Sequence, residues 1–192
     1  SSIPTHTGVS VTRSEETMTG SGNTSLIDST KGTLYFEAAN ISNLDGASKY
    51  TIGISDGTND NRIYLGYAYD NTITIDSKVA GSSGTGAIKT STLSEADQKL
   101  FNKAAGRYAS NNYKLYVNGE SIGSDTSVAV YSADSISQLN AASGFTSNPF
   151  YGKIKCLAYF NDILTDDEME ALTGDSYNNF GELATANGYT VQ

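Results

Sequence analysis

Apolar residues recur at every second position along much of the chain, and this period constrains the fold more than any other feature. The runs at residues 34–38 and 50–54 show it clearly. A period of two places successive side chains on opposite faces of a β-strand, so one face can be buried. We expect the interior positions of the strands to include Leu34, Phe36, Ile52, Ile54, Leu65 and Leu115.

Turn signals separate these runs, as antiparallel neighbours require. The loop at residues 56–60 joins two runs as a hairpin, and Asn118-Gly119 is the strongest short hairpin signal in the chain. Residues 80–92 are rich in Gly, Ser and Thr without an apolar period, which predicts a long loop. Two further short strands are expected, one at Val128 and Val130 and one at Ile136 and Leu139.

A well-marked helix follows the last strand-like run. Thr165 can cap its first turn while Glu168 reaches back to the capping residue. Leu164 and Met169 can pack across this cap, and Gly174 can end the helix in the left-handed conformation. The acidic run is therefore predicted to have a structural role.

Length and composition are consistent with one sandwich domain over residues 1–192. The net charge of −9 argues against a nucleic-acid partner, and no apolar stretch approaches the roughly 20 residues of a membrane span. The only cysteine, Cys156, cannot form an internal disulfide. A second helical face around residues 180–187 would extend the capped helix into a C-terminal appendage over residues 165–191.

Five segments occur in a characteristic order along the chain. They are Ser-Ile-Pro-Thr at 2–5 followed by Val-Thr-Arg at 11–13, the strand at 32–37, the hairpin at 54–63, the hairpin at 113–119, and the closing strand and capped helix at 152–168. In this order they resemble the concanavalin A-like (laminin G-like) domain of bacteriophage and prophage tail or structural proteins. The resemblance implies an all-β antiparallel jelly-roll sandwich with short C-terminal helices. It also implies that residues 1–31 are an entry segment joined to a larger upstream protein.

The function implied by this resemblance is a non-enzymatic virion domain, part of a tail fibre, appendage or structural protein, that recognises a host-surface glycan. Other virion proteins and further copies of the same chain would then be partners. The alternative is a purely structural module for oligomer assembly or particle decoration, without a ligand. Glycan hydrolysis is the least supported, because His6 is the only histidine and Glu168 and Glu170, two apart on a helix, point away from each other.

Tyrosine supplies the candidate ligand-binding residues, since the chain has 13 Tyr against 6 Phe and no Trp. A tyrosine ring can stack on a sugar while its hydroxyl forms a hydrogen bond. Tyr35, Tyr64 and Tyr116 lie opposite the apolar positions of their strands, where their side chains can be exposed. The favoured interpretation is that they cover the outer sheet or pack beneath loops, and the alternative is that they form a glycan platform. The candidate ligand-binding residues are Tyr64, Tyr116, Arg62 and Asn61.

Calcium is the one candidate cofactor. Asp56, Asn59 and Asp60 offer the hard oxygen ligands that calcium prefers, all within one loop. The same residues also favour tight turns, because Asp and Asn side chains bind their own backbone. The sequence therefore leaves both explanations of this loop open.

Overall fold

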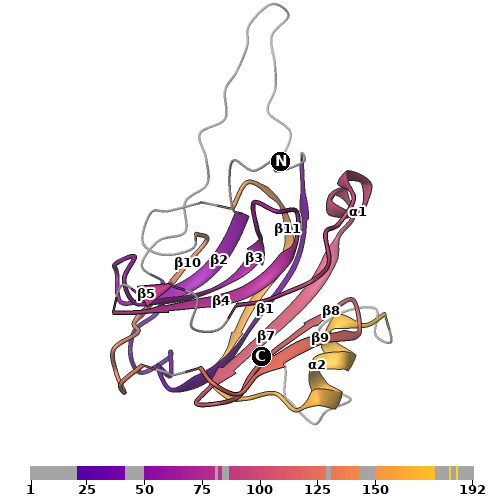
Figure 1. The fold of residues 1–192 in the computed structure, drawn as a ribbon. Coiled ribbons are helices and arrows are strands. Elements are labelled where there is room, and N and C mark those ends of the chain that lie inside the picture. The colour runs from indigo at the N-terminus through magenta and orange to yellow at the C-terminus, as the bar shows by residue number, and fades with distance from the viewer. Residues whose placement is uncertain are drawn as a thin grey trace, which may run out of the picture.

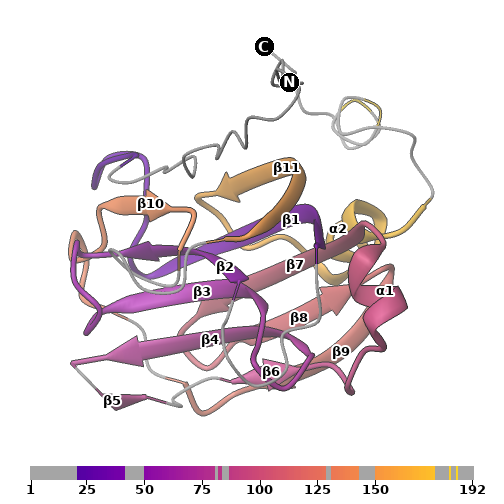
Figure 2. The same cartoon turned by 90° about the horizontal axis from the view of Figure 1, so that it is seen from above.

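The computed structural model describes residues 21–41, 50–80, 82–83, 87–128, 131–142, 150–175, 182 and 185. In this part of the chain the strands form two antiparallel sheets that pack face to face (Figures 1 and 2). The five-stranded sheet has the order β11 (Gly152–Phe160), β1 (Lys31–Asn40), β7 (Asn102–Ala109), β8 (Tyr113–Val117) and β9 (Glu120–Asp125). The six-stranded sheet has the order β10 (Gln138–Asn140), β2 (Tyr50–Ser55), β3 (Arg62–Tyr67), β4 (Ile73–Val79) and β5 (Ser82–Ser83), and β6 (Ile88–Lys89) also pairs with β4.

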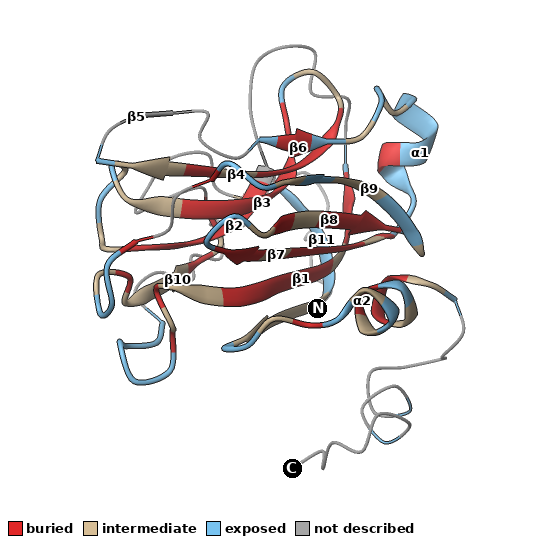
Figure 3. Cartoon of the chain, turned by 60° about the horizontal axis from the view of Figure 1, so that its bottom comes forward, coloured by how far each residue is buried: buried red, intermediate tan, exposed pale blue. Residues whose placement is uncertain are grey.

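The core lies between the sheets, and the predicted interior positions are confirmed. Side chains from both sheets meet in one apolar cluster, and buried positions run along the strands in Figure 3. Six predicted residues are 0% exposed: Leu34, Phe36, Ile52, Ile54, Leu65 and Leu115. The period of two thus assigned the buried face of each strand correctly.

Both predicted hairpins are also present. Residues 56–61 connect β2 to β3, and these two strands pair antiparallel. Asn118 and Gly119 connect β8 to β9 with φ angles of 51° and 84°. Two successive positive φ angles are typical of the turn whose twist matches a β-hairpin.

The loop predicted at residues 80–92 is partly wrong, because β5 and β6 lie within it. Ile88 is buried in the core, and its carbonyl oxygen accepts a hydrogen bond of 3.0 Å from the Thr74 hydroxyl. The buried Ile88 side chain and this hydrogen bond hold β6 against β4. Residues 81 and 84–86 lie outside the described part of the chain.

The two short strands expected after residue 127 are reduced to one, β10. Val128 is buried in the core but belongs to no strand, and Val130 lies outside the described residues. Ile136 is also a core residue outside a strand, because its backbone N–H donates to the Ser29 hydroxyl over 2.8 Å. A side-chain acceptor here replaces the partner strand.

Two helices accompany the sheets, α1 (Glu95–Lys99) and α2 (Asp166–Thr173). The capping box of α2 is confirmed, since Glu168 N–H donates to the Thr165 hydroxyl and Thr165 N–H donates to the Glu168 carboxylate. The left-handed conformation predicted for Gly174 is wrong, because its φ is −77° and its ψ is 178°. The Lys103 ammonium instead donates to the Gly174 carbonyl and stabilises this end of α2.

Other predicted segments fall largely outside the described residues. These include residues 1–20 of the entry segment, with His6, and most of the second helix predicted around residues 180–187. No described helix is both long enough and apolar enough to cross a membrane.

Candidate functional site

The two sheets differ in what covers their outer faces. Helix α1 contacts β1, and α2 contacts β7, β8 and β9, all of them strands of the five-stranded sheet. Leu164, Met169 and Leu172 form an apolar cluster with Tyr35 and Tyr116 on the outer face of that sheet. The outer face of the six-stranded sheet is the other candidate surface, although Ser55 and Tyr64 on it are buried and Arg62, Lys78 and Gln138 are only partly exposed.

Polar side chains form a row across this outer face. Arg62 on β3 pairs with Ser55 on β2 and with Lys78 on β4, and Ser55 pairs with Gln138 on β10. Direct cross-strand partners point to the same side of a sheet, and the neighbours of these residues, Ile54 and Ile63, face the core. We call Gln138, Ser55, Arg62 and Lys78 the outer row.

Tyr64 lies next to the outer row but is held by its neighbours. Its hydroxyl donates to Asp76 on β4 over 2.5 Å, and the Arg62 guanidinium lies 5.5 Å from the centre of its ring. Burial raises the pKa of Tyr64, and the hydrogen bond with Asp76 raises it further. Tyr64 therefore stays a neutral donor that orients Asp76.

Tyr35, Tyr64 and Tyr116 are each at most 5% exposed, which confirms the favoured interpretation that they cover the outer sheet or pack beneath other parts of the chain. The alternation of apolar and polar residues indicates that these side chains point away from the core, but it does not indicate which part of the chain covers them. Tyr35 and Tyr116 pack beneath α2.

Tyr64 and Tyr116 also cannot share one ligand. Tyr64 lies on the outer face of the six-stranded sheet, whereas Tyr116 lies on the outer face of the five-stranded sheet. The whole core separates these two faces. Of the four candidate ligand-binding residues, the structure brings together only Asn61, Arg62 and Tyr64.

The loop before Arg62 is stabilised by its own side chains. Asp56 accepts hydrogen bonds from the Thr58 backbone and hydroxyl and from the Asn61 amide. Burial raises the pKa of the Asp56 carboxyl, but these hydrogen bonds outweigh it and hold the pKa below its usual value. Asn61 then accepts a hydrogen bond from Ala80 N–H, which ties the loop to the end of β4.

The three candidate calcium ligands already have partners in the chain. Asp56 is engaged as described, Asn59 accepts from Arg62 over 3.2 Å, and Asp60 forms an ion pair with Lys78 over 3.3 Å. Two cationic side chains thus lie beside this loop. The described residues contain no group of three or more His, Cys, Asp or Glu side chains placed to hold a metal ion.

Two atoms of the outer row have unused hydrogen-bonding capacity. Arg62 Nε and Gln138 Oε1 are buried atoms with no hydrogen-bond partner among the described residues. Gln138 packs against Gly57, whose φ is +89° and where a Cβ atom would lie 3.0 Å from the Gln138 Nε2 atom. A buried polar atom without a partner costs about 1 to 3 kcal/mol.

Tyr69 is a candidate residue that the sequence reasoning missed. It lies in the turn between β3 and β4 and is 54% exposed. After burial and Asp76, Tyr69 adds to the raised pKa of Tyr64, and after Asp70 it adds to the raised pKa of Lys89. Tyr69 follows Tyr67, which ends β3 on the side opposite to Arg62. An aromatic residue beside Asp70 and Asn71 at a hairpin tip was the signal available in the sequence.

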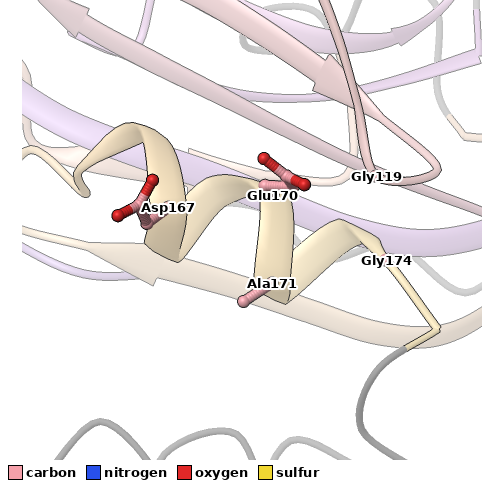
Figure 4. A pocket seen from close by; sticks show the side chains of 5 residues that line it. All are labelled: Gly119, Asp167, Glu170, Ala171 and Gly174. Atoms are coloured by element: carbon pink, nitrogen blue, oxygen red, sulfur yellow. The ribbon is translucent and has the colours of Figure 1, made fainter.

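Two hollows lie elsewhere on the described surface. One, of about 410 Å³, is lined by Gly119, Asp167, Glu170, Ala171 and Gly174 between α2 and the β8–β9 turn (Figure 4). The other, of about 350 Å³, lies beside residues 24–30 and 133–134. Neither is lined by an aromatic ring, and neither contains a predicted site residue.

Comparison with known proteins agrees with this architecture. The sequence model of the concanavalin A-like lectin/glucanases superfamily matches residues 17–170, which is most of the chain. The chain belongs to this superfamily. A search of the curated proteins found no match.

Solved structures with the same fold include carbohydrate-binding domains. The carbohydrate-binding module CBM40 of the Ruminococcus gnavus IT-sialidase, bound to α2,3-sialyllactose, has a TM-score of 0.61 and 19% identity over 83% of this chain and 97% of that chain. Domain 4 of AbnA, an extracellular arabinanase from Geobacillus stearothermophilus, in complex with arabinotriose, has a TM-score of 0.55 and 14% identity over 79% and 70%. The heptameric SAP-like pentraxin of Limulus polyphemus has a TM-score of 0.57 and 13% identity over 78% and 76%. At these identities the likeness shows a shared fold.

Proposed function

We propose that this domain is a non-catalytic carbohydrate-binding module that binds glycan on the outer face of its six-stranded sheet. The observation that carries the proposal is the exposed Tyr69 in the β3–β4 turn, at the opposite end of β3 from the outer row and on the sheet that α2 does not cover. The sugar complexes of two structures with the same fold support it.

The chemistry of this face suits a sugar. An exposed tyrosine ring can stack on the apolar face of a pyranose. Along β3, Tyr64 lies between Tyr69 and the Arg62 guanidinium, and its hydroxyl orients the Asp76 carboxylate. A few placed polar groups around an aromatic platform are typical of small-ligand sites.

An acidic sugar is the class that we place first. The described hydrogen-bond partner of the Arg62 guanidinium is the neutral amide of Asn59, so its charge is not used by a carboxylate there. Arginine binds carboxylates with two parallel hydrogen bonds, which makes it suited to a carboxylated sugar.

The biological setting that we propose is a bacteriophage virion, with the domain carried by a tail fibre, appendage or structural protein and directed at a host-surface glycan. The order of the five sequence segments supports this setting. A catalytic role is disfavoured because Glu168 caps α2 and its neighbour Asp166 binds Arg107 and Lys114.

A glycan array with sialylated and neutral oligosaccharides, followed by titration of a soluble hit, tests the proposal. Tyr69→Ala should weaken binding about tenfold or more, in line with the loss of one stacking contact. Leu26→Ala is the control, because Leu26 is 61% exposed and precedes β1, a strand of the other sheet. Arg62→Ala should weaken acidic sugars more than neutral ones. Equal binding by wild type and the Tyr69 variant would refute this site.

A further inference from the structure

The large apolar side chains that reach the surface are concentrated at one end of the five-stranded sheet. Seven such residues are exposed in the described part of the chain. Two of them, Leu26 and Tyr69, lie elsewhere. The other five lie at the start of β11, the end of β1 and the entrance to β7, and we call them the end patch: Ile41, Leu100, Phe101, Tyr151 and Ile154.

The strand register brings the members of the end patch together. Gly152 pairs with Asn40, and Asn102 pairs with Ala38, so Tyr151, Ile41 and Phe101 belong to three adjacent strand ends. The Asn40 amide donates to Gln98 on α1 over 3.1 Å, which holds α1 and Leu100 beside the same end (Figure 1). Each residue is 38% to 63% exposed. An apolar patch of several hundred Å² on a soluble domain marks an interaction surface.

Charges of opposite sign flank the end patch on its two sides. On the β11 side are Lys153 and Lys155; the Lys155 ammonium pairs with Glu37 over 2.9 Å and lies 4.1 Å from the centre of the Phe101 ring. On the other side, α1 carries Glu95 and Asp97 in its first turn and Lys99 in its last, and Lys99 pairs with Glu95, which leaves α1 with a net negative charge. β1 lies between the basic and the acidic side, because the order of the sheet is β11, β1, β7.

We infer that the end patch joins two copies of this chain around a two-fold axis. In such a pair each surface residue meets the counterpart across the axis, so the same patch must complement itself. Rotation about an axis through the end of β1 places the basic β11 side of one copy against the acidic α1 side of the other. The apolar centre is then buried between two complementary charge pairs. This inference does not depend on the glycan site.

The area of the end patch limits the affinity of the dimer. Two copies would bury roughly 1,000 Å² in total, near the lower limit for a specific interface. We therefore expect a reversible dimer with a dissociation constant between about 10 and a few hundred micromolar. The Tyr69 turn lies at the same end of the sandwich, since the Tyr67 hydroxyl donates to the Ala38 carbonyl and Leu93 N–H, just before α1, donates to the Asn71 carbonyl.

Sedimentation of the full chain from about 1 to about 500 µM tests the dimer, because the fraction of dimer must rise with protein concentration by mass action. Leu100→Asp should leave the protein monomeric over this range. Leu26→Asp is the matched control, since Leu26 is 61% exposed against 63% for Leu100 but lies outside the end patch, and it should dimerise like wild type. A wild-type protein that stays monomeric, or that forms trimers, would overturn the inference.

A charge reversal tests the two-fold arrangement separately and does not depend on an aspartate within the apolar patch. Lys153→Glu alone should weaken the dimer severalfold, because two like-charge contacts replace two attractive ones. Adding Glu95→Lys to the same chain should restore it toward the wild-type value. If the double variant dimerises no better than the single one, Lys153 does not face Glu95 of the second copy and the arrangement is wrong. Melting temperatures equal to wild type show that each variant is folded.

Discussion

Tyrosine shows how neighbours decide the role of a residue. The Tyr116 side chain points away from the core on the five-stranded sheet and is buried beneath α2. Tyr64 leaves the core on the six-stranded sheet, where Asp76 fixes its hydroxyl. Tyr69, only five positions further along the chain, remains exposed in a turn. The same side chain thus serves as packing, as an orienting donor and as a candidate sugar platform.

The core position Ile54 allows a direct test of the packing. Ile54→Ala should lower the free energy of unfolding by about 2 to 5 kcal/mol, because it removes a side chain that is fully buried between the sheets. Leu26→Ala, at an exposed position, should change it by about 0.5 kcal/mol or less. Urea unfolding of both variants is the measurement. Similar losses at the two positions would contradict the assigned core.

Helix α2 depends on contacts at its first turn as well as on its apolar face. Thr165 and Glu168 cap each other's backbone, and Asp166 reaches the sheet. These contacts fix the helix over Tyr35 and Tyr116. The element therefore acts as a cover for one outer face.

Removing the cap should weaken this cover. Thr165→Ala should cost about 1 kcal/mol of unfolding free energy, because Glu168 N–H loses its acceptor. Thr165→Ser keeps a hydroxyl at the cap and should cost much less. Chemical denaturation at neutral pH compares the two, and an equal loss in both would show that the methyl group, and not the cap, matters.

The ion pairs of Asp166 make part of the stability depend on pH. The hydrogen bond from Lys114 holds the pKa of Asp166 below its usual value against the opposing effect of burial, and the charge of Arg107 lowers it further. A carboxyl with a depressed pKa in the folded state stabilises the protein above its unfolded pKa, about 3.9. That contribution disappears as pH falls through the lower folded value.

Asp166→Asn should therefore lower the free energy of unfolding by about 1 kcal/mol at pH near 7, a modest value because the carboxylate is half exposed. The difference between variant and wild type should shrink as the pH is lowered below about 4. Denaturant unfolding at both pH values checks this. A difference that is constant with pH would mean that packing, not charge, is responsible.

At the scale of the whole molecule, the outer faces of the two sheets differ in what they carry. One outer face holds α2, and the opposite outer face carries the outer row at one end of β3 and the Tyr69 turn at the other end. The exposed apolar side chains gather at the end of the five-stranded sheet. The Tyr67 hydroxyl donates to the Ala38 carbonyl, so the Tyr69 turn and the end patch lie at the same end of the sandwich.

Calcium should leave the stability of the whole domain unchanged. The candidate ligands Asp56, Asn59 and Asp60 accept hydrogen bonds from the chain, and Arg62 and Lys78 place positive charge beside them. An ion that binds only the folded state must raise the melting temperature by mass action. We expect the same melting temperature with added calcium and with a chelator. A rise of several degrees with calcium would restore this loop as a metal site.

Local chemistry in the sequence determined much of this protein. The period of two assigned the core faces of the strands, Asn118-Gly119 gave the β8–β9 turn, and Thr165 with Glu168 gave the start of α2. Each of these depends on residues that are close together in the chain. Steric and hydrogen-bonding preferences over a few positions are enough to decide them.

Only the tertiary structure decided which surfaces are covered and which residues meet. Tyr64 and Tyr116 lie on opposite outer faces, and Ile88, from a polar segment, is buried in the core. At the end of α2, Lys103 donates a hydrogen bond to the Gly174 carbonyl, where the sequence predicted a left-handed glycine. Alternation states that a strand has two faces, but the membership of a strand in one sheet or the other depends on pairing between distant segments. What covers an outer face is likewise a contact between elements far apart in the chain, and no local pattern encodes it.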